Sequence, residues 1–241
     1  MPALLRMENV SKTYGSLRVT DNLSMHLDDG EALGVIGPNG AGKSTMFNLI
    51  AGGVKPDEGQ VMYDDRDITA LPPFDRRKAG IGRSYQIPHP FTGMTVFENL
   101  LVGATYGSDR SEAECYDDCV RVLDETGLLP KANVLAGSLT LLERKRLELA
   151  RALATRPRVL LLDEIAGGLT EHECVSLVET IKNIHKAGTS IIWIEHVVHA
   201  LLAVVERLIV INFGQKIEEG EPERVMNSPA VQEIYMGASV E

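Results

Sequence analysis

The sequence is poor in cysteine and in aromatic residues, and none of its apolar runs is long. Its three cysteines are an odd number, which argues against a disulfide framework. Cys115 and Cys119 lie one helical turn apart, but no further Cys or His stands nearby in the sequence to complete a zinc site. We therefore expect reduced thiols carried on a helix.

The apolar runs are too short to cross a membrane. The longest, at 159–162 and 191–194, have the length of strands, whereas a spanning helix needs roughly 20 apolar residues. Residues 1–6 lack the apolar core of a signal peptide. We therefore expect a cytoplasmic protein.

Positive charge is also in deficit, because 24 Lys and Arg stand against 34 Asp and Glu and give a formal net charge of −10. This balance argues against a broad nucleic-acid-binding surface, since such surfaces are basic. The length of 241 residues and the apolar fraction of 44% suffice for one large domain with a sizeable core. We expect a globular protein that binds no nucleic acid.

One glycine-rich stretch fits G-x-x-x-x-G-K-[ST], the phosphate-binding P-loop. The stretch consists of Gly37, Pro38, Asn39, Gly40, Ala41, Gly42, Lys43, Ser44 and Thr45. An apolar segment at 32–36 precedes it like a buried strand, and 45–51 follows it like a helix that ends at Gly52. The motif therefore has the strand–loop–helix context that it requires.

The residue types of this loop suit a nucleoside triphosphate. Glycines allow backbone N–H groups to converge on phosphate oxygens, and the start of the helix adds its positive dipole end. Lys43 can reach the β- and γ-phosphates, and the Ser44 hydroxyl can ligate Mg²⁺. We expect the chain to bind a nucleoside triphosphate with Mg²⁺.

Around the P-loop, strand and helix patterns alternate. Alternating or apolar runs predict strands at 3–10, 17–27, 60–63, 159–162, 189–194 and 208–211. Helical patterns dominate from about 91 to 154, where Ser111 and Glu114 form a capping-box signature. We predict an α/β P-loop NTPase with a mainly parallel core sheet, an antiparallel β subdomain and an α-helical subdomain inserted into a single domain, 1–241.

Two acids follow the apolar strand at 159–162. Asp163 and Glu164 stand where the carboxyl end of a buried parallel strand meets the ligand crevice of an α/β protein. Asp163 suits the Mg²⁺ shell, and Glu164 can polarise the water that attacks a phosphoryl group.

The order of these motifs resembles the nucleotide-binding subunit of ABC (ATP-binding cassette) transporters over essentially the whole chain. The resemblance implies an ABC ATPase that hydrolyses ATP with Mg²⁺ to drive transport. It makes Tyr14 the aromatic that stacks on adenine, with Val19 beside the same ring. It makes Gln86 the glutamine that reaches Mg²⁺ and the attacking water, and His196 the switch histidine that bonds a γ-phosphate oxygen.

The family signature Leu-Ser-Gly-Gly-Gln, which serves the ATP site of a partner subunit, is altered here. It falls on Leu139, Thr140, Leu141, Leu142 and Glu143. Two leucines replace glycines, and an acid replaces the glutamine. The basic residues 144–146 follow, either to offset that acid or as a solvated helix face. The D-loop position, 167–170, also departs from the family pattern. We hypothesise that this chain pairs with a second cassette whose signature is closer to the pattern.

Within the family, 39–48, 80–86, 95–100 and the segment 214–236 resemble importers of branched-chain amino acids. Such a subunit lies peripherally on the inner face of the membrane. Its partners are two membrane permease subunits and, indirectly, a periplasmic solute-binding protein. A groove around Gln86 would receive a permease helix, with Phe91, Met94 and Val96 as apolar anchors. The cassette does not touch the solute, so related importers would look much the same.

Other classes compete with this interpretation. A soluble ABC ATPase of an assembly complex, without membrane transport, would share every motif. A GTPase would carry an Asn-Lys-x-Asp segment, which this sequence lacks. An inactive interaction module is disfavoured because Lys43, Asp163, Glu164 and His196 are all present.

Overall fold

A six-stranded sheet forms the centre of the computed structural model, which describes residues 3–107 and 110–237. Its strand order is β10-β9-β3-β8-β7-β6, and all neighbours pair in parallel except β10, which is antiparallel to β9. The strands are β3 (Ala32–Ile36), β6 (Ile81–Arg83), β7 (Val159–Asp163), β8 (Ser190–Ile194), β9 (Arg207–Asn212) and β10 (Gln215–Gly220). Every residue of β3, β7 and β8 is buried, as expected for parallel strands covered on both faces.

A second, antiparallel sheet has the order β2-β1-β4-β5. Its strands are β1 (Leu5–Tyr14), β2 (Leu17–Leu27), β4 (Glu58–Tyr63) and β5 (Arg66–Asp67). The predicted end of the first strand at residue 10 is wrong, because β1 continues to Tyr14 and turns only at Gly15. Register shifts along β1 absorb the irregular pattern that suggested a turn at 12–15.

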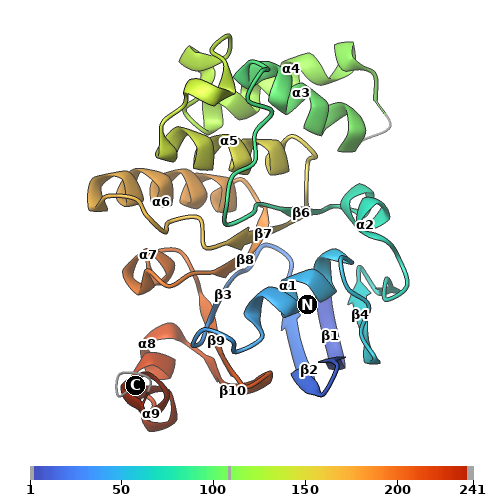
Figure 1. Ribbon diagram of the computed structural model, residues 1–241, viewed down its shortest axis with the longest axis vertical. Helices are drawn as coiled ribbons and strands as arrows, with labels where there is room; N and C mark the ends of the chain where they lie inside the picture. The colour runs from blue at the N-terminus through green and yellow to red at the C-terminus, as the bar shows by residue number, and fades with distance from the viewer. Residues whose placement is uncertain (1–2, 108–109, 238–241) are drawn as a thin grey trace.

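Helices cover the sheets and leave two apolar cores. One core lies between the antiparallel sheet, the parallel sheet and α1 (Lys43–Ala51), and the other lies on the opposite side, under the longer helices (Figure 1). Those covering helices include α6 (Glu171–Lys186) and α7 (Val198–Leu202), and the C-terminal part adds α8 (Pro222–Met226) and α9 (Pro229–Gly237). The sequence analysis missed α2 (Pro73–Ala79), which begins with the proline that suits a first helical position.

Three helices enter the chain between β6 and β7 and form a separate layer above the sheet (Figure 1). They are α3 (Val96–Gly107), α4 (Glu112–Glu125) and α5 (Leu141–Leu153), with short 3₁₀ turns at Leu129–Lys131 and Ala136–Ser138. The predicted capping box at Ser111 of α4 is present, and α6 begins with another at Thr170. The predicted fold class is therefore confirmed, with the helical segment starting at Val96 rather than near 91.

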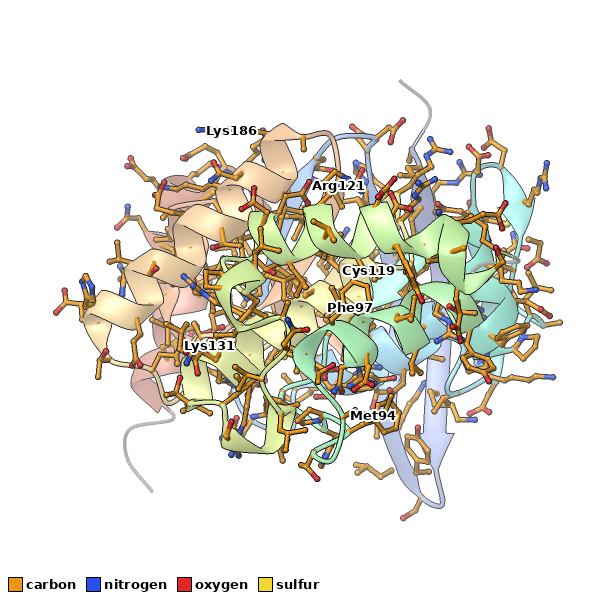
Figure 2. The ribbon with its side chains drawn as sticks, turned by 90° about the horizontal axis from the view of Figure 1, so that it is seen from above. Met94, Phe97, Cys119, Arg121, Lys131 and Lys186 are labelled. Atoms are coloured by element: carbon orange, nitrogen blue, oxygen red, sulfur yellow. The ribbon has the colours of Figure 1, made fainter. Side chains whose placement is uncertain are left out.

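The cysteines lie in the apolar interior, packed among helices. Cys119 of α4 and Phe97 of α3 lie at the seam between the two helices in the view from above (Figure 2). Cys115 and Cys119 lie on α4, as predicted, and they and Cys174 of α6 are free and buried. Val96, predicted as an apolar anchor for a permease helix, is fully buried and cannot serve as one.

Two kinds of feature are missing from the part of the chain that the structure describes. Its helices are all too short or too polar to pass through a bilayer. It also holds no group of three or more His, Cys, Asp or Glu side chains placed to bind a metal by themselves.

Candidate active site

The P-loop connects β3 to α1 in a conformation that excludes side chains at two glycines. Gly37 has a φ of 156°, and a Cβ there would lie 2.1 Å from the carbonyl oxygen of Ile211. Gly42 has a φ of 102°, and its Cβ would lie 2.5 Å from the carbonyl oxygen of Val19. Because neighbouring backbone presses on both positions, only glycine lets the loop curl above the start of α1.

Lys43 is buried inside this loop, with 5% of its surface exposed. Its Nζ donates to the carbonyl oxygens of Gly37 at 2.7 Å and Pro38 at 2.9 Å. Burial lowers the pKa of Lys43, and the nearby charges of Glu164 and Asp163 oppose that shift. The loop therefore holds the ammonium group next to both predicted acids.

A cavity of about 180 Å³ opens above the P-loop. It is lined by Val19, residues 39–45 and Glu164. Gly37 and Pro38 are not among the lining residues, and their carbonyl oxygens accept from Lys43. Tyr14 does not line this cavity and lies at the exposed end of β1, where the Lys12 ammonium is 5.7 Å from its ring centre. Tyr14, predicted to stack on adenine, therefore lies outside the phosphate cavity.

Asp163 is buried at the end of β7 and paired with an arginine that the sequence analysis did not single out. Arg83 donates to Asp163 Oδ2 at 2.8 Å and to Asn48 Oδ1 at 2.7 Å. The Arg83 guanidinium also lies over the rings of Phe47 and Tyr85. No local pattern marks this pair, since its residues are 80 positions apart.

Glu164 joins the predicted catalytic residues. It follows β7 in the left-handed region, with a φ of 47°. The Gln86 side-chain amide donates to Glu164 Oε2 at 2.5 Å, and His196 Nε2 lies 2.6 Å from Glu164 Oε1. The three side chains come from the loops after β6, β7 and β8, so the carboxyl ends of neighbouring parallel strands bring them together.

A second cavity, of about 300 Å³, lies on the other side of Glu164. Gln86, Glu164, Lys145, Glu195 and His196 are among its lining residues. Glu164 lines both cavities and therefore separates the phosphate cavity from this one.

The basic run after the signature is not a solvated helix face. Lys145 and Arg146 are buried or half-buried, and Arg146 donates to the Ser176 hydroxyl on α6 at 2.7 Å. Arg144 is exposed but bonds back to the carbonyl oxygens of Leu139 and Gly137. Sequence periodicity could not assign these contacts, because they depend on how α5 packs.

The altered signature forms the start of α5. Thr140 is the N-cap residue, and it shares a capping box with Glu143. Lys131 lies 2.5 Å from the Glu143 carboxylate, so the charge that this acid brings is paired within the chain. Leu141 is 45% exposed and Leu142 is half-buried. First-turn amides have no carbonyl partner within the helix, and the one of Glu143 donates to the Thr140 hydroxyl oxygen instead.

Comparison with known proteins decides the family. The model of the ABC transporter family matches residues 20–167. This chain belongs to the ABC transporter family. The cassette is 33% identical to the lipopolysaccharide export system ATP-binding protein LptB of Haemophilus influenzae, over 98% of each chain. It is 34% identical to the high-affinity branched-chain amino acid transport ATP-binding protein LivG of Salmonella typhimurium, over 97% of this chain and 98% of LivG.

A solved structure of an ABC cassette has the same fold as this chain. An ATP-binding cassette of an ABC transporter in its ADP conformation superposes with a TM-score of 0.91 and 32% identity. The alignment covers 98% of this chain and all of that one. The cassette is therefore an ATPase that uses ATP with Mg²⁺.

The residues predicted to hold Mg²⁺ are suited to it by type. Ser44, Gln86 and Asp163 offer hydroxyl, amide and carboxylate oxygens, the hard ligands that Mg²⁺ prefers. In this structure each has a different setting: Ser44 is exposed near the start of α1, Gln86 bonds Glu164, and Asp163 pairs with Arg83. Nucleotide phosphates would supply the remaining ligands, as Mg²⁺ sites of few protein ligands require.

Proposed function

We propose that this cassette is the energy-coupling subunit of an ABC importer for branched-chain amino acids. The convergence of Gln86 and His196 on Glu164, beside a formed P-loop, supports the ATPase role. The likeness to LivG along nearly the whole chain supports the solute class. The nearly equal likeness to LptB favours a second candidate, the ATPase of a lipopolysaccharide exporter.

The proposed hydrolytic step assigns a role to each of these residues. Glu164 accepts a proton from the attacking water, and Gln86 orients the carboxylate through its amide. His196 turns from Glu164 to donate to the charge that develops on the γ-phosphate. Lys43 binds the β- and γ-phosphates when it leaves the Gly37 and Pro38 carbonyls. Ser44, Gln86 and Asp163 would hold Mg²⁺, which would supply positive charge next to the phosphates.

The segment after Gln86 is the proposed docking site for a permease helix, which would place the cassette peripherally on the inner face of the membrane. Ile87 is 63% exposed and Phe91 is 46% exposed, while Met94 is half-buried. Gln86 itself bonds Glu164, so a helix seated on this segment acts on the hydrolytic group through one side chain. Replacing Phe91 and Met94 by Ala is expected to weaken co-purification with the permease subunits. Val120→Ala, an exposed apolar change on α4, is the control, and undiminished co-purification of the double variant would contradict the proposal.

Cassettes of this family dimerise and work with membrane subunits. We propose that this one pairs with a second, different cassette. Its own P-loop then meets a signature with glycines, while its Leu141 and Leu142 face the partner's ATP. The bulk of these leucines keeps their N–H groups at a distance from phosphate, so the partner's site hydrolyses more slowly.

Transport by a reconstituted complex tests the solute class. The complex is assembled in proteoliposomes from this cassette, its genomic neighbour cassette, the permease subunits and the solute-binding protein. Radiolabelled leucine transport on addition of ATP to the cassette side is expected, and a complex with Glu164→Gln serves as the inactive control. Failure of leucine, isoleucine and valine transport, with lipopolysaccharide extraction by the same complex, would establish the exporter instead. ATPase activity with no membrane partner recovered from native membranes would support the soluble assembly ATPase.

Hydrolysis measured with each cassette alone and with both mixed tests the pairing. We expect slow hydrolysis by this chain alone and at least a tenfold increase on mixing. Fast hydrolysis by this chain alone at low concentration would refute the heterodimer.

A further inference from the structure

Glu195, which no part of the proposed hydrolytic step uses, is a buried carboxylate at the end of β8. Only 1% of its surface is exposed. Oε1 accepts from the backbone N–H groups of His196 at 3.0 Å and Val197 at 3.3 Å, and Oε2 accepts from that of Ala166 at 2.9 Å. One carboxylate therefore ties the loop of the switch histidine to the residue directly before the D-loop.

A buried charge requires a counter-charge, because an isolated carboxylate is costly to remove from water. Lys145 on α5 offers one. The lysine is 5% exposed, lines the second cavity with Glu195, and faces the charges of Glu195 and Glu164. Its Nζ lies 3.5 Å from the carbonyl oxygen of Glu164, the residue held in the left-handed conformation. Burial lowers the pKa of Lys145 and these two acids oppose the shift, as expected for an ammonium group enclosed with carboxylates.

We propose that Glu195 is a positioning residue for ATP hydrolysis, with Lys145 as its charge partner. Glu195 fixes the backbones from which His196 and the D-loop begin, and Lys145 fixes the carbonyl of Glu164. Lys145 belongs to α5, the helix that begins with the signature. The buried pair therefore fixes the position of Glu164 and His196, which act in this chain's ATP site, relative to the signature, which acts in the ATP site of the partner. A shift of α5 removes the ammonium from Glu164 and Glu195 and disturbs both loops.

The inference rests on the proposed roles of Glu164 and His196. Two kinds of measurement separate it from them. Steady-state ATP hydrolysis by the full chain gives kcat and KM, and hydrogen exchange reports the three amides bound by Glu195. The amide hydrogen-exchange rates do not depend on whether Glu164 or His196 is catalytic. If Glu164→Gln keeps its activity while the amides lose protection in Glu195→Gln, the proposed role of Glu164 fails and the tie between the loops stands.

Glu195→Gln keeps the side-chain shape but replaces one acceptor oxygen by a donor, so at least one loop loses its bond. We expect kcat to fall at least tenfold, KM for ATP to change by less than twofold, and exchange at Ala166 or at His196 and Val197 to accelerate at least tenfold. Lys145→Met is expected to lower kcat, Lys145→Arg to retain it within threefold, and the double variant to be no slower than Glu195→Gln alone. The control variants are Lys182→Met and Glu179→Gln, which make the same kinds of change in an ion pair on the surface of α6.

A kcat within twofold of wild type in Glu195→Gln would overturn the proposal, as would additive losses in the double variant. Should Glu195→Gln not fold, the comparison of Lys145→Met with Lys145→Arg decides. Equal activity of those two variants would overturn the proposal, and activity retained only by arginine would support it.

Discussion

At the scale of single residues, Glu164 has the most contacts within the proposed machinery. It lies between two cavities, bonds Gln86, faces His196, and has its backbone carbonyl next to Lys145. Gln86 holds the carboxylate of Glu164 and Lys145 holds its carbonyl, whereas His196 must turn away from Glu164 to reach the γ-phosphate. Such preorganisation is expected where a proton must leave a water in the transition state.

Glu164→Gln is predicted to lower ATP hydrolysis at least about a hundredfold, the usual contribution of a general base. ATP affinity should change little, because the P-loop and Lys43 are untouched, and ATP-bound dimers should accumulate. Malachite-green phosphate release and fluorescent-nucleotide titration measure the two quantities. Glu171→Gln, in the first turn of α6, is the control for loss of one acid. Wild-type hydrolysis by Glu164→Gln would refute the assignment.

Asp118 provides a prediction about stability instead. Burial opposes its ionisation, but Arg156 and Arg110, through hydrogen bonds and charge, outweigh burial and lower the pKa of Asp118 to about 2 from 3.8. A depressed folded-state pKa means that this stabilisation is present above the unfolded pKa and is lost as pH falls through about 4 to about 2. The contribution at neutral pH is about 2 kcal/mol.

Asp118→Asn should therefore lower the free energy of unfolding at pH 7 by about that amount and flatten the pH dependence below about 4. Urea unfolding at pH 7 and at pH 3 gives the comparison. Asp117→Asn, at the exposed neighbouring position, should leave both values unchanged. Equal unfolding free energies of Asp118→Asn and wild type at pH 7 would show that the arginines do not stabilise the fold through this acid.

At the scale of elements, α5 combines two tasks, because its capped first turn is also the altered signature. Glu143→Ala removes half of the capping box and the ion pair with Lys131, and it should cost about 1 kcal/mol of stability. Glu143→Gln keeps the reach of the cap and should cost less. Glu114→Ala breaks the equivalent box on α4, far from the signature in the chain.

Thermal unfolding and ATPase rates of the assembled dimer measure the two tasks. Comparable loss of stability is expected from Glu143→Ala and Glu114→Ala, with reduced hydrolysis only in Glu143→Ala. If both variants lower the ATPase rate equally, the effect reflects stability and gives the signature turn no separate role.

Some features of the helices, strands and loops could be predicted from the local sequence, and others could not. The P-loop, the acids after β7 and the boxes at Ser111 and Thr170 are local patterns, and their structures follow from neighbours within a few positions. The end of β1, the helix α2 and the burial of Val96 depend on packing against distant segments. The same holds for the pairing of Arg83 with Asp163 and for the place of Lys145, because each joins separate layers. Glu195 carried a weak signal, an acid directly after an apolar strand, like Glu164.

At the scale of the whole molecule, the signature turn and the P-loop belong to different layers, with the parallel sheet reaching from one to the other (Figure 1). The P-loop starts at β3, whereas the signature begins a helix inserted between β6 and β7. A chain arranged in this way presents its two ATP-binding elements separately, which suits a site completed by a second subunit. It also allows the two elements to be tested independently.

Restoring the signature is the sharpest test of the idea that this chain has one strong and one weak half-site. The triple variant Leu141→Gly, Leu142→Gly, Glu143→Gln is combined with Lys43→Ala, so that it offers a restored signature and no working P-loop. Mixed with wild-type chain, it should hydrolyse ATP at least tenfold faster than either chain alone, because the wild-type P-loop then meets glycine amides that approach phosphate closely. The same mixture with Glu164→Gln in the chain that supplies the P-loop should be inactive. No gain on mixing, with both chains folded, would show that Leu141 and Leu142 do not limit hydrolysis.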